Sequence, residues 1–409
     1  MYWMANRAAR LGGPIKGMKI SRPIMSVTSQ NGNLSIIVAE FEANPMRIVH
    51  YLNHTCRGNG HVSVAVDLAC EQVRNGHDVY IVCGFGDFDE LLAANGVKVV
   101  TLGETTGRFR MLEMTRRLLP VLRKLRPDVV NAHMVYAALS AWIVRPLIGF
   151  RLVTTVHNSF DPQASLLRVG DKVIVVSDAV GMEMQRRGIP PVKLRTVTNG
   201  TIGGVLRPPY CGAPEHLEHP AVVTVGGLHS RKGVAYLIDA FDIARQTVPG
   251  AHLYLVGGGP EQPDFEARAR ATSSADHIHF LGWREDPRDV LASADLFVLA
   301  SLRDPCPLVI FEAREMGNPI IASAVDGIPA ALAEGRRGVL VPPADAQALA
   351  REIVRVLTDS ELRAQLSDAA QESLEDITVR RVSSETIGVY TEALQLKGVR
   401  SPSARLSRP

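Results

Sequence analysis

The sequence predicts an α/β protein made of two tandem domains, each a doubly wound, Rossmann-like parallel sheet. Short apolar runs of strand length alternate with segments of helical periodicity along most of the 409 residues, which is typical of a parallel sheet with helices on both faces. The alternation stops once, in a proline-rich stretch near the middle of the chain, and then begins again. Two such sheets in tandem place a ligand at the carboxyl ends of both, in a central cleft between the domains.

The alternating segments follow one another in a regular order. In the first half they are Arg47–Tyr51, His61–Arg74, Asp78–Val82, Val97–Val100, Met111–Leu125, Asp128–Asn131, Tyr136–Ile148, Arg151–Val156, Lys172–Val176 and Ala179–Arg187. In the second half they are Ala221–Val225, Val234–Gln246, His252–Val256, Ile278–Phe280, Val290–Ala292, Leu296–Leu299, Leu308–Met316, Pro319–Ser323 and Val339–Val341. Three helical stretches follow at Ala346–Thr358, Ser360–Glu372 and Val379–Lys397.

This order divides the chain into six predicted parts. Proline fixes φ and removes backbone donors, so the stretch with Pro208, Pro209, Pro214 and Pro220 is predicted to be a linker rather than an element. The parts are a disordered extension (1–45), an N-terminal Rossmann-like acceptor domain (46–205), the linker (206–220), a C-terminal Rossmann-like donor domain (221–378), a helix that crosses back to the N-terminal domain (379–397) and a disordered tail (398–409).

The composition excludes several classes of protein. An apolar fraction of 46% is ample for two cores, and a formal net charge of +3 gives no global field that would recruit nucleic acid. The five cysteines are scattered and form no Cys-x-x-Cys pair, which argues against a disulfide framework or a zinc site and favours a cytoplasmic location. No run reaches the ~18 apolar residues of a membrane-spanning helix.

Glycine-rich turns precede predicted helices in both domains. Before the first helix, Arg57–Gly60 would let backbone N–H groups approach a phosphate or sugar at Gly60, although such a turn can serve backbone geometry alone. In the second domain, the loop from Gly226 to Gly233 adds Arg231 and Lys232, which suit a diphosphate; the alternative is an exposed basic pair.

Two further features of the second domain fit the same ligand. Gly257 begins a Gly-Gly-Gly-Pro turn after the next strand. This turn could let a ligand approach the backbone closely, and the alternative is that it is only a tight turn. Asp304 and Glu312 are eight residues apart around a predicted helix start, so that both carboxylates could face one ligand, Glu312 a ribose diol and Asp304 a sugar hydroxyl. The N–H groups of Leu308 and Val309 would face the diphosphate.

A structural alternative is open for the two acids. In it, Asp304 caps the helix, and Glu312 pairs with a neighbour such as Arg314 or Arg336.

Two histidines of the first domain, His133 and His157, each follow an apolar strand at the carboxyl edge of the predicted sheet. A lone histidine is more often structural, but two at corresponding positions indicate the cleft.

The segment 108–126 carries seven Arg and Lys residues against Glu113 alone, interleaved with apolar residues. A basic amphipathic helix can lie on an anionic membrane, and it can equally be an ordinary solvated helix face. Pro120 is predicted to interrupt this helix.

Together these motifs resemble the retaining, metal-independent glycosyltransferases of family 4, the glycosyl transferases group 1, which have the GT-B fold. The resemblance spans roughly residues 46–395. Its matching text is Asn59-Gly60-His61-Val62, Asp67-Leu68-Ala69, Gly76-His77-Asp78-Val79, His133, Thr155-Val156-His157, Val176-Ser177, Asn199-Gly200, Gly226 to Gly233, Val256 to Pro260, Phe280-Leu281-Gly282, Ala294-Asp295, Ser301, Phe311-Glu312-Ala313, Gly317-Asn318-Pro319 and Gly338 to Pro342.

The resemblance implies a hexosyltransferase-type enzyme. The cysteine content predicts that it is cytoplasmic, and the segment 108–126 predicts peripheral contact with the inner face of the cytoplasmic membrane. The implied enzyme would transfer a sugar from a nucleotide-activated donor to a glycan or lipid-linked acceptor with retention, without a metal or other cofactor, in cell-surface polysaccharide or glycolipid biosynthesis. The implied catalytic residues are His157, Asp304, Arg231 and Lys232. The implied donor-binding residues are Gly60, His133, Gly226, Arg231, Lys232, Gly257, Leu308, Val309 and Glu312.

The sequence departs from the family pattern in several places. Asp304 stands where the Glu-x7-Glu motif has its first acid, Cys306-Pro307 replaces Phe-Gly, and Asn59 replaces the first glycine of a pair. The shorter Asp304 changes which sugar hydroxyl can be reached. Two rival functions are open: a nucleotide-sugar epimerase of the same fold, and a non-catalytic nucleotide-sugar-binding subunit of a polysaccharide-assembly complex.

Overall fold

The computed structural model describes residues 29–30, 33–34 and 45–396. It confirms the α/β fold class with two Rossmann-like domains. The chain divides into two compact units, Met1–Pro45 and Met46–Pro409. In the first unit, strands β1 (Ser29–Gln30) and β2 (Asn33–Leu34) pair antiparallel. The rest of the predicted extension and the predicted tail lie outside the described residues.

The N-terminal domain contains a sheet of seven parallel strands. The middle strands are apolar and β-branched, and β7 is buried at every position, as expected for a sheet covered on both faces. The spatial order is β5 (Lys98–Thr101), β4 (Asp78–Cys83), β3 (Arg47–Tyr51), β6 (Val129–Ala132), β7 (Arg151–Val156), β8 (Lys172–Val175) and β9 (Leu194–Thr196).

Helices cover both faces of this sheet. On one face, α4 (Arg110–Leu125), α5 (Val135–Val144) and α6 (Asp178–Arg186) share a core with the strands. On the other face lie α2 (Gly60–Arg74) and α3 (Asp89–Ala94). Short 3-10 turns lie at Arg145–Leu147, Pro162–Val169 and Pro191–Lys193.

The C-terminal domain repeats this plan with six parallel strands. Their order is β12 (Ile278–Gly282), β11 (His252–Val256), β10 (Ala221–Val225), β13 (Leu296–Leu299), β14 (Ile320–Ser323) and β15 (Val339–Val341). One face packs on α7 (Val234–Arg245), α8 (Gln262–Arg270), α12 (Ala346–Thr358) and α13 (Ser360–Ala370), and the other on α9 (Arg288–Leu291), α10 (Leu308–Glu315) and α11 (Ile328–Ala331).

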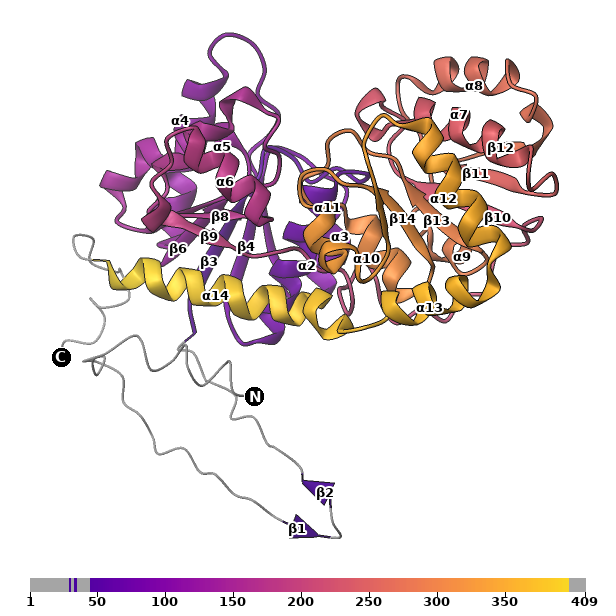
Figure 1. Ribbon diagram of the computed structural model, residues 1–409. Coiled ribbons are helices and arrows are strands. Elements are labelled where there is room, and N and C mark those ends of the chain that lie inside the picture. The colour runs from indigo at the N-terminus through magenta and orange to yellow at the C-terminus, as the bar shows by residue number, and fades with distance from the viewer. Residues whose placement is uncertain (1–28, 31–32, 35–44, 397–409) are drawn as a thin grey trace. The chain divides into compact units, whose positions relative to one another are not determined.

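The last helix, α14 (Val379–Gln395), returns to the N-terminal domain, along which it runs in yellow in Figure 1. Val382, Val389 and Tyr390 are buried in the core beneath α2. The helix begins at Thr378, whose hydroxyl accepts the N–H of Arg381, a typical N-cap. The segment before α14 also pairs with the chain leaving the first domain, through a parallel bridge between Ile202 and Thr378.

The predicted interruption at Pro120 is wrong, because α4 runs without a break from Arg110 to Leu125. Pro120 and Arg116, whose carbonyl loses its intrahelical donor, are both exposed. Water can therefore bond that carbonyl, which makes a proline tolerable at this position. The helix buries only Met114, Leu118 and Leu122.

Six observed α-helices and strands are missing from the sequence prediction: β1, β2, α3, β9, α8 and α11. The strand β9 has only three residues, none of them buried. The helix α8 buries only Phe265 and Ala269, so it lacks the apolar stripe that marks a helix in sequence.

Candidate functional site

The candidate site lies where the strand order of the C-terminal sheet reverses, between the neighbouring strands β10 and β13. Ligands of doubly wound sheets bind outside the carboxyl ends of the strands at such a point. The loop after β10 carries Arg231 and Lys232, and the loop after β13 carries Ser301 and Asp304. The fold thus brings together Lys232 and Asp304, which are 72 residues apart in sequence.

Lys232 and Asp304 form a nearly buried ion pair. Lys232 Nζ lies 2.6 Å from Asp304 Oδ2, with side-chain exposures of 14% and 7%. Ser301 Oγ donates to the same carboxylate oxygen at 3.2 Å, and the N–H of Asp304 donates to Asp326 Oδ2 at 2.7 Å. A pair so shielded from water is weakly screened, and its hydrogen bonds fix the ammonium group in one place.

Two of the predicted glycines meet beside this pair. A Cβ on Gly257, where φ is +137°, would lie 2.0 Å from the carbonyl oxygen of Gly226, so only glycine allows the two turns to touch. A Cβ on Gly226 would lie 3.7 Å from Lys232 Cε. No side chain of these two glycines therefore covers the backbone at the ends of β10 and β11, next to the ammonium group of Lys232.

Arg231 connects the two domains. Its carbonyl oxygen accepts the N–H groups of Leu302 at 2.8 Å and Arg303 at 3.2 Å, which ties the loop after β10 to the loop after β13. Its guanidinium lies over the ring of Phe160, 5.4 Å from the centroid, in the loop after β7 of the first domain.

Glu312 lies inside α10 and is 5% exposed. Arg207 Nε, from the segment that joins the domains, donates to Glu312 Oε1 at 2.7 Å. Arg207 is itself positioned by its neighbour, because the N–H of Leu206 donates to Asp67 Oδ1 in α2 at 2.9 Å. The carboxylate predicted to hold a ribose is thus paired with a cation from the interdomain segment.

The helices α2 and α10 approach each other at their N-termini. A Cβ added to Gly60, the first residue of α2, would lie 3.5 Å from Leu308, the first residue of α10. The N–H groups at both helix starts lack intrahelical acceptors and carry partial positive charge. Arg57 and Glu285 form an ion pair between the domains near the same place.

Cys306, one of the departures from the family pattern, packs against the cores of both domains. Burial raises the pKa of its thiol to about 12, which outweighs hydrogen bonds from Asn199. The thiol is therefore protonated at neutral pH and lacks the reactivity of a thiolate. We interpret Cys306 as a packing residue.

His133 and His157 lie at the carboxyl ends of β6 and β7, within the N-terminal domain. His133 Nδ1 is 3.0 Å from His157 Nε2, and His133 Nε2 is 2.9 Å from Nδ1 of the buried His50. His133 is 4% exposed, and both of its ring nitrogens have partners. Neither ring nitrogen of His133 is thus free, whereas His157 is half-buried. That His133 contacts the donor stays a prediction.

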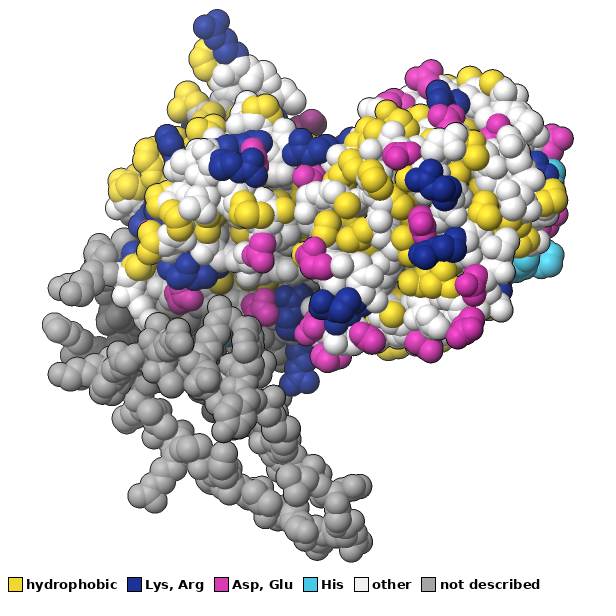
Figure 2. Space-filling model, in the orientation of Figure 1, with side chains coloured by type: hydrophobic (Ala, Val, Ile, Leu, Met, Phe, Trp, Pro, Cys, Tyr) yellow, Lys and Arg dark blue, Asp and Glu magenta, His cyan; other side chains and the backbone are white. Residues whose placement is uncertain are grey.

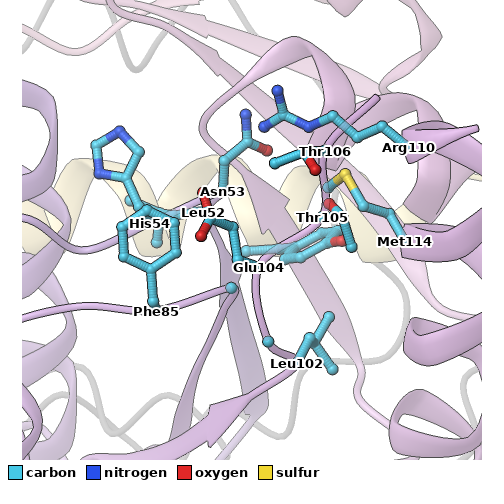
Figure 3. Close-up of a pocket in the computed structure, with 13 residues that line it drawn as sticks. Leu52, Asn53, His54, Phe85, Leu102, Glu104, Thr105, Thr106, Arg110 and Met114 are labelled. Carbon is cyan, nitrogen blue, oxygen red and sulfur yellow. The ribbon is translucent and has the colours of Figure 1, made fainter. Parts of the chain in front are cut away.

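A cavity of about 140 Å³ opens at the carboxyl ends of β3, β4 and β5. Figure 3 shows the guanidinium of Arg110 and the amide of Asn53 pointing toward each other within it. Arg110 Nε and Asn53 Oδ1 are buried without a hydrogen-bond partner among the described residues. His54 and Phe85 stack on the other side, with centroids 6.0 Å apart. The remaining lining residues are Tyr51, Leu52, Gly84, Leu102, Gly103, Glu104, Thr105, Thr106 and Met114.

The structural alternative, in which Asp304 caps the helix and Glu312 pairs with Arg314 or Arg336, is wrong. No side chain caps α10, whose N-cap is Pro307, and Glu312 pairs with Arg207 rather than with Arg314 or Arg336. Arg314 instead donates to the carbonyl oxygens of Ala370 and Glu372.

The residues predicted for the site do not include Arg207 or His50. Arg207 lies in a proline-rich stretch without helical or strand periodicity, so no local sequence pattern identifies it as a site residue. A signal did exist for His50, which is a histidine inside a predicted buried strand and must therefore find a polar partner.

Two family models match the chain. The model described as glycosyltransferase family 4 matches residues 58–201, and the model described as glycosyl transferases group 1 matches residues 219–359. The first match lies in the N-terminal domain and the second in the C-terminal domain. Together they cover more than two thirds of the chain.

Two relatives and one solved structure illustrate this similarity. The lipopolysaccharide core biosynthesis glycosyltransferase LpsE of Rhizobium meliloti is 27% identical over 272 residues, 65% of this chain and 77% of that protein. Glycogen synthase of Mycobacterium tuberculosis is 26% identical over 411 residues, 91% and 98% of the two chains. Alr3699/HepE of Anabaena, solved with UDP and glucose, has the same fold, with a TM-score of 0.73 and 20% identity over 85% of this chain and all of that one.

Proposed function

The chain belongs to the family 4, group 1 glycosyltransferases, and on this premise we propose that it moves a sugar from a nucleoside-diphosphate donor to a glycan or lipid-linked acceptor, with retention at the anomeric carbon. The observation that carries the proposal is the fixed pair of Lys232 and Asp304 beside the bare glycine turns of β10 and β11. This arrangement offers a cation for a diphosphate and a carboxylate for a sugar hydroxyl. We further propose that the reaction belongs to cell-surface polysaccharide or glycolipid biosynthesis.

In the proposed donor complex, the diphosphate lies against Lys232, Arg231 and the N–H groups of Leu308 and Val309. The ribose diol binds Glu312, which then exchanges its bond to Arg207 for one to the nucleotide. The UDP in the Anabaena Alr3699/HepE structure supports a nucleoside-diphosphate ligand for this fold. In the proposal, the positive charge comes from side chains and helix starts rather than from a metal or other cofactor.

In the proposed reaction, the bond between the anomeric carbon and the donor phosphate oxygen breaks as the acceptor oxygen attacks from the same face. The acceptor hydroxyl passes its proton to the departing phosphate oxygen. Charge therefore develops on the diphosphate, where a pre-placed ammonium group stabilises the transition state. His157 and Asp304 would hold the transferred sugar.

The function is tested by incubating the protein with a panel of nucleoside-diphosphate sugars, with and without glycan and glycolipid acceptors. We expect nucleoside diphosphate to be released in an acceptor-dependent way, with a product whose anomeric configuration by NMR matches the donor. An altered nucleotide-sugar formed without acceptor would indicate the epimerase instead. Tight donor binding with neither transfer nor hydrolysis would indicate a non-catalytic binding subunit.

We propose the cavity around Arg110 and Asn53 as the place where the acceptor binds. Its volume of about 140 Å³ suits one sugar ring or headgroup, and the stacked His54 and Phe85 offer an apolar face to a ring. The unpaired Arg110 Nε and Asn53 Oδ1 provide a donor and an acceptor.

Arg110→Ala should raise the KM for the acceptor about tenfold, because a hydrogen bond from a charged group is lost, while the KM for the donor stays the same. Initial rates at saturating donor measure this. Arg116→Ala on the exposed face of α4 is the matched control. Equal acceptor KM values for the Arg110 and Arg116 variants would rule out the cavity as the acceptor site.

We propose that the N-terminal domain docks on the cytoplasmic face of an anionic membrane through an α4–α5 surface. We define this surface by the exposed apolar residues Phe109, Leu112, Trp142, Ile143 and Leu147 and the exposed cations Arg108, Arg116, Arg123 and Lys124. The two helices pack against each other, and Figure 2 shows basic and hydrophobic side chains side by side over this domain. None of the described helices is long and apolar enough to cross a membrane.

The double variant Phe109→Ser/Leu112→Ser should bind vesicles rich in phosphatidylglycerol at least about tenfold more weakly, because two large side chains no longer enter the interface. Co-sedimentation at low and high salt measures the binding. Val192→Ser, a change at a similarly exposed apolar residue outside this surface, serves as the control. Vesicle binding that the double variant retains in full would contradict the proposal.

A further inference from the structure

A chain of buried hydrogen bonds leads from α2 to His157. Gln72 Oε1 lies 2.8 Å from His50 Nε2, His50 Nδ1 lies 2.9 Å from His133 Nε2, and His133 Nδ1 lies 3.0 Å from His157 Nε2. Gln72 and His50 are fully buried, and His133 is 4% exposed. The residues come from α2, β3 and the ends of β6 and β7. The chain of hydrogen bonds therefore crosses the sheet between β3 and β6, where the strand order reverses.

The three histidines are neutral at physiological pH. Burial lowers the pKa of His50 to about 4 and that of His157 to about 3, and it lowers the pKa of His133 well below its usual value. A neutral imidazole has one N–H and one lone pair. Each ring in the chain must therefore donate on one side and accept on the other, and all three must take the same tautomer.

Gln72 selects which tautomer this is. Its oxygen only accepts, so His50 must carry its proton on Nε2. His50 Nδ1 then accepts from His133 Nε2–H, and His133 Nδ1 accepts from His157 Nε2–H. The chain therefore leaves the lone pair of His157 on Nδ1.

Tyr390 of α14 is a second polar neighbour of Gln72. Asn131 Nδ2 donates to the hydroxyl oxygen of Tyr390 at 2.9 Å. Burial raises the pKa of Tyr390, and the N–H groups of Asn131 and Gln72 oppose that rise. Gln72 Nε2 makes no hydrogen bond of good geometry among the described residues. The orientation of the amide therefore rests on its oxygen, which lies 2.8 Å from His50 Nε2.

We propose that Gln72, His50 and His133 act as positioning residues that hold His157 in the Nε2–H tautomer, so that its Nδ1 accepts a hydrogen bond from a hydroxyl of the transferred sugar. This inference rests on the proposed function. His157 is half-buried at the carboxyl end of β7, and its Nδ1 has no partner among the described residues. An acceptor fixed in advance orients the sugar without reorganisation in the transition state.

The first test needs no substitution. In full-length protein labelled with 15N-histidine, NMR should show His157 with a protonated Nε2 and an unprotonated Nδ1, assigned by the resonances that His157→Gln removes. Adding a nucleoside-diphosphate sugar should shift the Nδ1 resonance, whereas the nucleoside diphosphate alone should not. A proton on Nδ1 in the free protein would overturn the proposal, whether or not the protein transfers sugars. So would an Nδ1 resonance that the sugar leaves unchanged, if calorimetry shows that the nucleotide-sugar binds.

The second test removes the anchor. Gln72→Met keeps the length of the side chain but has no acceptor for His50 Nε2–H, so both tautomers of His157 should appear. The value of kcat should fall about three- to tenfold, the effect of about one hydrogen bond, with the KM for the donor unchanged. As a control, His279→Gln breaks the histidine pair at the far end of the other sheet, where His252 Nδ1 and His279 Nε2 are 3.0 Å apart, and should change neither. A folded Gln72→Met protein with the native tautomer and native kcat would contradict the proposal.

Discussion

Replacing Lys232 by alanine is expected to lower the rate of glycosyl transfer about a hundred- to a thousandfold, the usual loss when one fixed group that stabilises a developing oxyanion is removed. The ammonium group is 2.6 Å from Asp304 and nearly buried, so no nearby solvent cation can replace it. Both kcat and kcat/KM should fall, because the interaction strengthens as the diphosphate departs. Steady-state kinetics with the donor and acceptor of the transfer assay measure the effect.

The variant also leaves Asp304 without its counter-ion, so a loss of stability must be separated from a loss of chemistry. Lys232→Ala/Asp304→Asn removes the unpaired charge and should restore the thermal unfolding temperature without restoring transfer. Lys98→Ala breaks an exposed ion pair with Asp78 of similar length, 2.7 Å, and should leave the rate unchanged. Near-native transfer by Lys232→Ala would exclude this lysine from the leaving-group site.

Glu312→Ala is expected to weaken binding of the nucleoside diphosphate about ten- to a hundredfold, because a charged acceptor for the ribose diol is lost. Calorimetry with UDP and other nucleoside diphosphates measures this directly. Glu315→Gln, on the same helix, serves as the control, since Glu315 pairs with the buried Arg288.

Arg207, the partner of Glu312, provides a second variant for this experiment. If the ribose displaces Arg207, then Arg207→Ala should bind the nucleotide at least as tightly as the native protein, while Glu312→Ala binds it more weakly. Weaker binding by Arg207→Ala would assign the guanidinium itself to the nucleotide. Unchanged affinity in Glu312→Ala would remove this acid from the donor site.

Much of the fold could be predicted because each βα unit carries its own local signals. Apolar runs such as Arg151–Val156 are long enough to mark buried strands, and the glycine turns at Gly226 and Gly257 mark where strands end. The site loops could be found for the same reason, since parallel strands bring their carboxyl ends to one edge.

The pairings within the site could not be predicted, because they depend on segments that carry no pattern of their own. Arg207 reaches Glu312 from an interdomain segment that Asp67 holds against α2. His50, His133 and His157 come from three strands, and no spacing in the sequence encodes their alignment. The prediction at Pro120 was wrong for the opposite reason. Proline usually interrupts a helix, but here it lies on an exposed face of α4, where water can bond the carbonyl group that loses its donor.

The pairing of the two crossover segments restricts how the domains can move. The chain passes between the domains twice, and these passages lie side by side at Ile202 and Thr378, where the N–H of Val379 donates to the carbonyl oxygen of Ile202 at 2.9 Å. Arg381 adds bonds to the carbonyl oxygens of Thr198 and Asn199. Two adjacent, hydrogen-bonded segments allow the domains to bend about one axis but hinder their rotation about the connection. Any rearrangement of the domains around a bound donor would therefore be such a bend. A shortened C-terminus would therefore cost the enzyme its alignment as well as its stability.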